Sequence, residues 1–461
     1  MRNKRSSNVL IFIVLVILVC SLSYYFFQRF KSSRDISFLQ IQNCNLILLT
    51  IDALRADHLT CYGYKRDVAP NICEASRKGI LFENAISQSS WTKPSMGSLF
   101  TSLYPHSHKA IGQHDVLPLE VLTLAEILKY NGYYTIGFQT NPFIREIHNF
   151  DQGFDDYLTY HHFTRAEVLI SEFISRINLN EVPKFFAYFH FMDLHLPYNP
   201  PKEYRLKSEA NYNGILAEDS FDQLWPVREG ELKLREEDKQ HIISLYDGEI
   251  NYVDSQIKRL LDFLKEIQIS DNTIIVILSD HGEEFWDHDG FEHGHTMYNE
   301  LLHVPLIILH PRLTTTNFRI QGLIRLIDIF PTLMSVLRIS IPSRVIGRNL
   351  LEEIFIRKQN LKLIGFSEST LYGQEQKAVQ TNSYKLIKRL KDSSTEFFDL
   401  SVDPHEKFNN FNNEQLKPII EQYEKLLQIF SQYNSITDYL SKKKEFDEKT
   451  LEELKALGYI R

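Results

Sequence analysis

Continuous apolar runs that end in polar residues are the dominant pattern between residues 45 and 340. Two of them, Asn45–Ile51 (NLILLTI) and Thr273–Leu278 (TIIVIL), are almost entirely apolar. Runs of this kind are typical of parallel strands that are buried on both faces of a sheet. Weaker or more aromatic runs predict further strands over residues 81–86, 133–138, 184–192 and 304–309.

Segments with helical periodicity separate these runs. Helices are predicted over residues 70–78, 117–130, 166–177, 238–267 and 322–337. The alternation of strands and helices predicts an α/β fold with a mainly parallel sheet flanked by helices. We assign residues 44–340 to this main domain, which we expect to carry the catalytic site.

Beyond Pro342 the predicted elements are shorter and more polar. They fall at residues 363–367, 377–388 and 396–400 and are followed by a charged helix at 413–430. These short strands and the helix after them predict a small C-terminal α+β subdomain with terminal helices, which we place at residues 341–461.

The N-terminus differs from the rest of the chain. A basic tail (1–8) precedes a mostly apolar run (9–27) that is about as long as a bilayer-spanning helix, and a polar tether (28–43) follows. No small-x-small cleavage site follows the run, so we interpret it as an uncleaved signal anchor; a buried core helix is the alternative. Basic residues flank both ends almost equally. The large domain that follows favours a single-pass membrane protein with its catalytic domain in the periplasm or outside the cell.

Composition narrows the class of function. The formal net charge is -8, and no basic block beyond the first 35 residues offsets it, which argues against nucleic acid as a partner. Of the four cysteines, Cys20 lies in the predicted anchor. The remaining three allow at most one disulfide.

Acidic side chains follow the two most apolar strands directly. Asp52 comes after the first, and Asp280 with His281 comes after the run at 273–278. Ligands collect at the carboxyl ends of strands in α/β sheets. An N-cap of the next helix is the alternative for Asp280. Together these side chains predict a site for a divalent cation (zinc, manganese, magnesium or calcium).

Thr92 lies where a hydroxyl-rich loop enters a helix, a position that favours an anion at the helix N-terminus. A simple cap is the alternative. Beside a metal, which it would also help to bind, the Thr92 hydroxyl would become able to attack phosphorus or sulfur.

Three histidines are further candidates for the site. His195 follows the aromatic run at 184–192 together with Asp193, and His293 and His295 follow the Asp-His pair. We expect them to bind the oxygens of the transferred group, with His195 or His293 also protonating the leaving group or holding a second metal. Purely structural roles are the alternative. The charged segment at 201–234 is predicted to pass over the site.

The chain from Asn45 to its C-terminus resembles the sulfatase branch of the alkaline-phosphatase superfamily. The segments that carry the resemblance are TIDALRADHLTCYGY, TKPSMGSLFTSLYPHSH, GFDDY, MDLHLPYNPP, LSDHGEEFWDHDGFEHGH and FFDLSVDPHEKFN. The resemblance implies an alkaline-phosphatase-like fold, a metal held by Asp52, Asp280 and His281, and a nucleophile at Thr92.

The sequence also departs from that family. Sulfatases of the formylglycine type carry Cys or Ser in a Cys-x-Pro-Ser-Arg pattern, where this chain has Thr92-Lys93-Pro94-Ser95-Met96. Ala53 replaces the second acid after the first strand, and residues 137–141 (GFQTN) replace a Gly-Lys-Trp-His segment. A threonine nucleophile is instead similar to phosphoethanolamine and glycerol-phosphate transferases and to nucleotide-pyrophosphatase-like phosphodiesterases of the superfamily. Those phosphoethanolamine transferases have several membrane spans, whereas this chain has one predicted span.

These features predict a metal-dependent hydrolase or transferase that cleaves a phosphoester, or a sulfate ester, through a covalent Thr92 intermediate. The substrate is expected to be a phosphate or sulfate ester, with a lipid or a glycan as its alcohol part. Two alternatives are a sulfuric ester hydrolase without formylglycine and a catalytically inactive binding protein with the same fold. The oligomeric state is not predicted.

Overall fold

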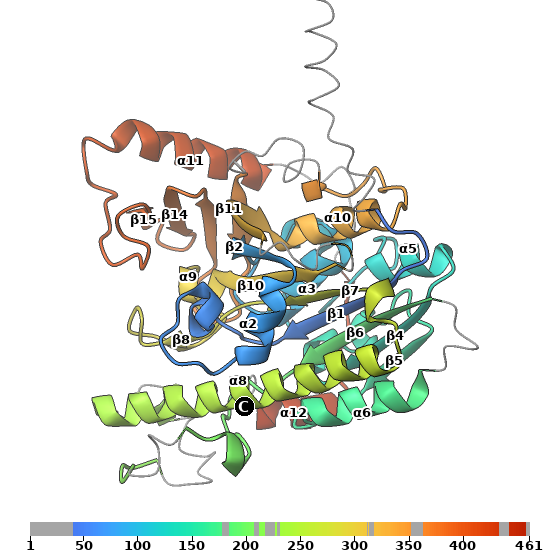
Figure 1. Cartoon of the computed structure of the whole chain (residues 1–461). Helices are drawn as coiled ribbons and strands as arrows, with labels where there is room; N and C mark the ends of the chain where they lie inside the picture. Colours follow the sequence, from blue (N-terminus) through green and yellow to red (C-terminus); the bar gives the residue numbers. More distant parts are fainter. Residues whose placement is uncertain are drawn as a thin grey trace, which may run out of the picture.

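An eight-stranded sheet forms the centre of the molecule, in the strand order β11-β2-β10-β7-β1-β6-β4-β5 (Figure 1). The computed structural model describes residues 40–177, 184–206, 212–216, 226–227, 231–310, 312, 318–351, 363–432 and 442–457. The strands are β1 (Asn45–Ile51), β2 (Ile80–Ile86), β4 (Tyr134–Gln139), β5 (Asp156–Thr159), β6 (Phe185–Phe191), β7 (Thr273–Leu278), β10 (His303–Leu309) and β11 (Phe318–Arg325). Only β10 runs antiparallel to its neighbours, β2 and β7. The predicted mainly parallel α/β architecture is therefore confirmed.

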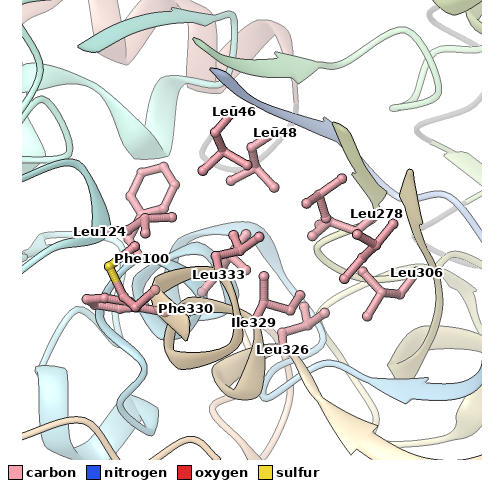
Figure 2. Packing of buried hydrophobic residues seen from close by; sticks show 14 of the residues in the cluster. Leu46, Leu48, Phe100, Leu124, Leu278, Leu306, Leu326, Ile329, Phe330 and Leu333 are labelled. Atoms are coloured by element: carbon pink, nitrogen blue, oxygen red, sulfur yellow. The ribbon is translucent and has the colours of Figure 1, made fainter. Parts of the chain in front are cut away.

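Helices cover both faces of this sheet. Leu46 and Leu48 of β1 point to one face, where they belong to the same buried cluster as α3 (Thr92–Thr101), α5 (Leu124–Tyr130) and α10 (Ile329–Val336). Figure 2 shows part of this packing, with Leu278 and Leu306 near Ile329 and Leu333. The alternate residues of β1 face α2 (Pro70–Arg77), α6 (Ala166–Arg176) and α8 (Glu236–Glu266). Because side chains alternate along a strand, a continuous apolar run supplies both layers.

Two predicted helices are shorter than their periodicity suggests. The helix predicted over 117–130 begins only at Leu124, because Thr123 and Glu126 form a capping box. The segment predicted as a helix over 322–337 starts as strand β11 and becomes helix α10 only after Asp328. Paired hydrogen bonds from Arg325 to Asp328, the shortest 2.6 Å, form the turn between them.

The C-terminal region divides into two parts. Strands β12 (Gly365–Glu368), β13 (Gln376–Gln380), β14 (Tyr384–Arg389) and β15 (Thr395–Asp399) form an antiparallel sheet that packs against α11 (Lys417–Gln432). The following helix α12 (Glu448–Ala456) lies on the opposite side of the molecule from α11 (Figure 1). There Leu454 and Leu457 join a cluster with Trp91, Phe143 and Met192. The predicted sheet-bearing subdomain is thus present, and the last helix packs on the main domain.

Two further predictions concern the ends and the cysteines. Cys61 and Cys73 form a disulfide, while Cys44 is buried and reduced. Within the described ranges, none of the helices is both long and apolar enough to cross a bilayer. The tail at 1–8, the predicted anchor at 9–27 and most of the tether at 28–43 lie outside the described residues.

A buried ionic group joins the small sheet to the main domain. Glu368 contacts His106 Nδ1 at 2.6 Å and Lys377 Nζ at 2.9 Å. Burial alone would raise the pKa of Glu368, but His106 and Lys377 outweigh it and lower that pKa from 4.5 to about 2.

This group predicts an acid-sensitive contribution to stability. Because the pKa of folded Glu368 is depressed, the contribution is complete above pH 4.5 and is lost as the pH falls toward about 2. We expect Glu368→Gln to lower the free energy of unfolding at pH 7 by on the order of 2 kcal/mol. Urea unfolding of the wild type and Glu368→Gln at pH 7 and pH 3 checks this. The difference between their free energies of unfolding should be smaller at pH 3. A difference that stayed constant or widened at pH 3 would contradict it.

Candidate active site

Four polar side chains meet at the carboxyl edge of β1 and β7. Asp52 follows β1, Asp280 and His281 follow β7, and Thr92 is the first residue of α3. Because Thr50 of β1 pairs in parallel with Leu278 of β7, both strands deliver their acids to the same edge. All four side chains are buried. The structure therefore brings together every residue predicted to bind the metal.

The distances within this group are short. Thr92 Oγ1 lies 3.4 Å from Asp52 Oδ2 and 3.3 Å from His281 Nε2. His281 Nε2 lies 3.5 Å from one oxygen of Asp52 and 3.5 Å from one oxygen of Asp280. His281 Nδ1 donates to the carbonyl of Gly282 at 2.8 Å, so Nε2 presents its lone pair to the two carboxylates.

The donor set fits a divalent cation. Among the described residues, Asp52 Oδ1 and Asp280 Oδ2 have no hydrogen-bond partner although both are buried. Ligand atoms of Asp52, Asp280 and His281 all lie within 4.8 Å of one another. Buried carboxylate oxygens are normally paired or bound to a metal. A cation between the two acids would satisfy both orphaned oxygens.

The pKa values of the two acids diverge for a related reason. Burial raises the pKa of Asp280, and the negative charge of Asp52 raises it further. Burial also acts to raise the pKa of Asp52, but the hydrogen bond from His190 and the charges of His281 and His190 outweigh it, so this pKa is lowered. Two like charges this close cannot both ionise easily without a cation.

Two residues at this site, Asn141 and His190, were not predicted from the sequence. Asn141, just beyond β4, donates from Nδ2 to Asp52 Oδ2 at 2.9 Å and to Thr92 Oγ1 at 3.2 Å. Its Oδ1 accepts from the Phe143 amide, which fixes the orientation of the side chain. His190 on β6 binds Asp52 Oδ2 at 2.9 Å and Tyr188 at 2.9 Å. Both residues lie at or near strand ends, but only the pairing of β6 with β1 and of β4 with β6 brings them to Asp52.

Asn141 should be important for turnover. Replacing it with alanine removes the donor to Thr92 Oγ1, so we expect kcat/KM to fall on the order of 100-fold. Steady-state kinetics measures the loss, and metal content should stay unchanged because no ligand is removed. Asn149→Ala, which removes an amide that contacts the carbonyl of Leu117 instead, is the control. Equal effects of the two substitutions would contradict this role for Asn141.

The predicted histidines occupy different places. The His293 ring lies 4.4 Å from the His281 ring and 5.0 Å from the His195 ring, between centroids. His293 Nδ1 contacts Glu283 Oε1 at 2.9 Å, and burial raises the pKa of Glu283 to about 7. His195 Nδ1 contacts the Leu196 carbonyl at 2.8 Å, and burial, with the charge of His293, lowers the pKa of His195 to about 4.

His295, Asp193 and Lys93 make other contacts. His295 Nε2 pairs with Glu284 Oε2 at 2.8 Å and is partly exposed. Asp193 accepts from the Ala166 amide at the start of α6. Lys93, next to Thr92 in sequence, points to backbone carbonyls, including that of Asp115 at 3.0 Å. Burial lowers the pKa of this lysine well below its usual value.

A cavity of about 280 Å³ opens beside His195. Its polar lining includes His162, Arg165, Asp193, Asn199 and Glu249. Arg165 contacts Glu249 at 2.6 Å and Asp193 at 3.5 Å, so the charged side chains of the lining pair with one another. The segment at 201–234, predicted to pass over the site, lies largely outside the described residues.

The fold and this site define an α/β ester hydrolase with an Asp/His group suited to a divalent metal beside a buried hydroxyl. A family model described as "Sulfatase" matches residues 44–339, and one described as "N-sulphoglucosamine sulphohydrolase, C-terminal" matches residues 287–432. The chain belongs to the sulfatase family. This confirms the predicted family and enzyme class.

Individual relatives agree with this assignment. A sulfatase of Formosa agariphila is 23% identical over 84% of this chain and 87% of its own length. An arylsulfatase of Clostridium perfringens is 24% identical over 83% of this chain and 93% of its own length.

Solved structures share the fold. A protein in complex with its substrate D-glucosamine-2-N,6-O-disulfate has a TM-score of 0.72 at 19% identity, over 84% of this chain and 97% of that one. A phosphonate monoester hydrolase of Agrobacterium radiobacter has a TM-score of 0.70 at 19% identity, over 87% of this chain and 100% of that one.

Proposed function

We propose that this sulfatase-family hydrolase cleaves a phosphoester through a covalent intermediate on Thr92 Oγ1, with water or an alcohol as the final acceptor. The observation that carries the proposal is the position of Thr92 Oγ1, 3.3 Å from His281 Nε2, 3.4 Å from Asp52 Oδ2 and 3.2 Å from Asn141 Nδ2. A threonine cannot yield the aldehyde used by formylglycine sulfatases. In this proposal the Thr92 hydroxyl itself is therefore the nucleophile.

Asp52, Asp280, His281 and Thr92 would hold the divalent ion. When bound, it would lower the pKa of the hydroxyl and neutralise charge on the oxygens of the transferred group. The oxygen-rich ligand set with one imidazole leaves zinc, manganese, magnesium and calcium as candidates.

The protein residues divide the proton transfers between them. A bond would form from Thr92 Oγ1 to phosphorus as the ester P–O bond breaks, and the hydroxyl, acidified when the cation is bound, would release its proton to water. His293, supported by Glu283, donates a proton to the leaving alcohol. His195, with Nδ1 donating to the Leu196 carbonyl, offers Nε2 as the acceptor for the proton of the incoming water or alcohol. Attack at phosphorus then breaks the Thr92–O–P bond, Thr92 Oγ1 takes a proton from water, and the proton on His195 passes to the neighbouring His293, which returns both histidines to their starting states.

The cavity beside His195 supports a hydroxyl-rich alcohol part, because the partly exposed side chains of Arg165 and Asn199 line it and can form hydrogen bonds with hydroxyl groups. Two relatives are named as an iduronate 2-sulfatase of Homo sapiens and a delta 4,5-hexuronate-2-O-sulfatase of Bacteroides thetaiotaomicron. We therefore favour a glycan over a lipid headgroup as the alcohol part.

Sulfuryl transfer by the same threonine is the second candidate, favoured by the family and by relatives with sulfatase names. The two are separated by assaying the metal-loaded full-length protein on aryl phosphate, aryl phosphodiester and aryl sulfate. Greater turnover of either phosphoester is expected. Turnover of aryl sulfate alone would replace the first proposal with the second. If no substrate turns over and the Asp/His group binds no metal, a binding protein with the sulfatase fold is the better account.

We also propose a single membrane anchor at residues 9–27, with the catalytic domain in the periplasm or outside the cell. The Cys61–Cys73 disulfide supports this location, because disulfides persist in oxidising compartments. Protease added to intact expressing cells, or to cells with a permeabilised outer membrane, should digest the catalytic domain. Protection until the inner membrane is lysed would contradict the topology.

A further inference from the structure

A second group of metal-ligating side chains lies apart from the Asp52 group. His161 and His162 lie in the turn between β5 and α6, and Glu453 lies on α12. Each of the three offers a ligand atom within 4.8 Å of the others. The catalytic proposal uses none of these side chains.

Three buried atoms of this group lack hydrogen-bond partners among the described residues. His162 is 4% exposed, and neither of its ring nitrogens has a hydrogen-bond partner. Glu453 is 3% exposed, and its Oε1 has no partner either. The closest approach between the two is 3.5 Å, from His162 Nδ1 to Glu453 Oε2. Burying the His162 nitrogens and Glu453 Oε1 without a hydrogen bond costs free energy, so we expect a ligand that contacts them.

Arg145 accounts for only one of the two glutamate oxygens. Its Nη2 contacts Glu453 Oε2, and its Nη1 lies 3.4 Å from Thr450 Oγ1. The guanidinium therefore neutralises the carboxylate through Oε2 and leaves Oε1 available on the other side. Its positive charge would weaken a cation site, which argues for an ion that binds through strong imidazole bonds rather than through charge alone.

We propose that His161, His162 and Glu453 form a second divalent-metal site, suited to zinc. Two imidazoles and one carboxylate are typical zinc ligands, whereas calcium and magnesium prefer oxygen ligands alone. His161 is exposed, so solvent can complete a four-coordinate shell. This proposal does not depend on the reaction at Thr92.

The site would fasten the last helix to the main domain. Helix α12 already packs through Leu454 and Leu457 against Trp91 and Met192. Met192 and His162 also line the cavity beside His195. A metal bound at Glu453 would therefore hold α12 against the wall of that cavity, and its removal should make α12 more susceptible to protease.

Metal titration of the full-length protein tests the proposal. After stripping with a chelator, the wild-type protein should bind one equivalent of Zn²⁺ at the His161 group, in addition to any that the Asp52 group takes. Glu453→Gln and His161→Asn should each bind one equivalent less than the wild type, and Asp280→Asn, altered at the other group, should still bind one. Co²⁺ titrated into Asp280→Asn should give the visible absorption of a tetrahedral site, and His161→Asn added to that background should abolish it.

Thermal unfolding provides a second test in case Glu453→Gln, which alters a buried residue, folds poorly. His161 is exposed, so His161→Asn should fold normally, as circular dichroism would show. In the Asp280→Asn background, Zn²⁺ should raise the melting temperature by several degrees and slow cleavage at α12. Both effects should disappear with His161→Asn. No Zn²⁺ bound by Asp280→Asn, or an undiminished Zn²⁺ response after His161→Asn is added to that background, would overturn the proposal.

Discussion

Replacing Thr92 with valine should lower kcat by at least about 1,000-fold, because the substitution keeps the shape of the side chain and removes only the nucleophilic oxygen. Serine at the same position restores a hydroxyl and should retain measurable turnover. Thr92 Oγ1 also accepts a hydrogen bond from Asn141 and faces Asp52 and His281, so no other described hydroxyl occupies the same position. Initial rates on the best aryl ester of the panel measure the effect.

Covalent labelling makes this test specific to the mechanism. Acid-quenched wild-type protein should carry the transferred group on the peptide that contains Thr92, and the valine variant should carry none. Thr101→Val is a matched control, because Thr101 lies on the same helix and donates only to the carbonyl of Gly97. Turnover that survives Thr92→Val, or a label elsewhere in the chain, would contradict a threonine intermediate.

Local sequence predicted the centre of this fold because its strands carry an unambiguous signal. Asn45–Ile51 and Thr273–Leu278 are buried on both faces, so they are apolar throughout and the acid that follows each one is conspicuous. These strands are neighbours in the sheet, which places Asp52 beside Asp280. The position of Thr92 depended on the family resemblance, since a hydroxyl at a helix entrance is usually a cap.

The remaining site residues depend on strand order, which local patterns do not contain. His190 lies within the aromatic strand β6 and looks like a core residue until β6 pairs with β1 beside Asp52. Asn141 reaches the same acid from β4, the next strand along. The predicted starts of the helices over 117–130 and 322–337 were wrong for a different reason. A capping box starts α5 at Leu124, and an Arg-Asp turn separates β11 from α10, both inside runs whose hydrophobicity continues.

Asp280→Asn should stabilise the metal-free protein but remove the stabilisation that bound metal gives. In the metal-free protein burial and the negative charge of Asp52 raise the pKa of Asp280, and Asp280 Oδ2 has no partner in the described residues. An asparagine keeps the contact from the His281 amide to Oδ1 and replaces the orphaned oxygen with a donor. We expect it to stabilise the chelated protein by on the order of 1 kcal/mol.

With metal present, the wild-type protein should be more stable than Asp280→Asn. Saturating the wild-type centre at about 100 times its dissociation constant adds about 2.7 kcal/mol to the folded state, and the variant should gain almost none of this. Thermal unfolding with chelator and with metal measures both effects, in a His161→Asn background so that only the Asp52 group responds. Asp193→Asn is the control, because this buried acid follows the neighbouring strand β6 but contacts Arg165 and α6. If Asp280→Asn kept the full metal response, the ion would have to bind elsewhere. A group other than the cation would then have to compensate the close approach of the Asp52 and Asp280 carboxylates.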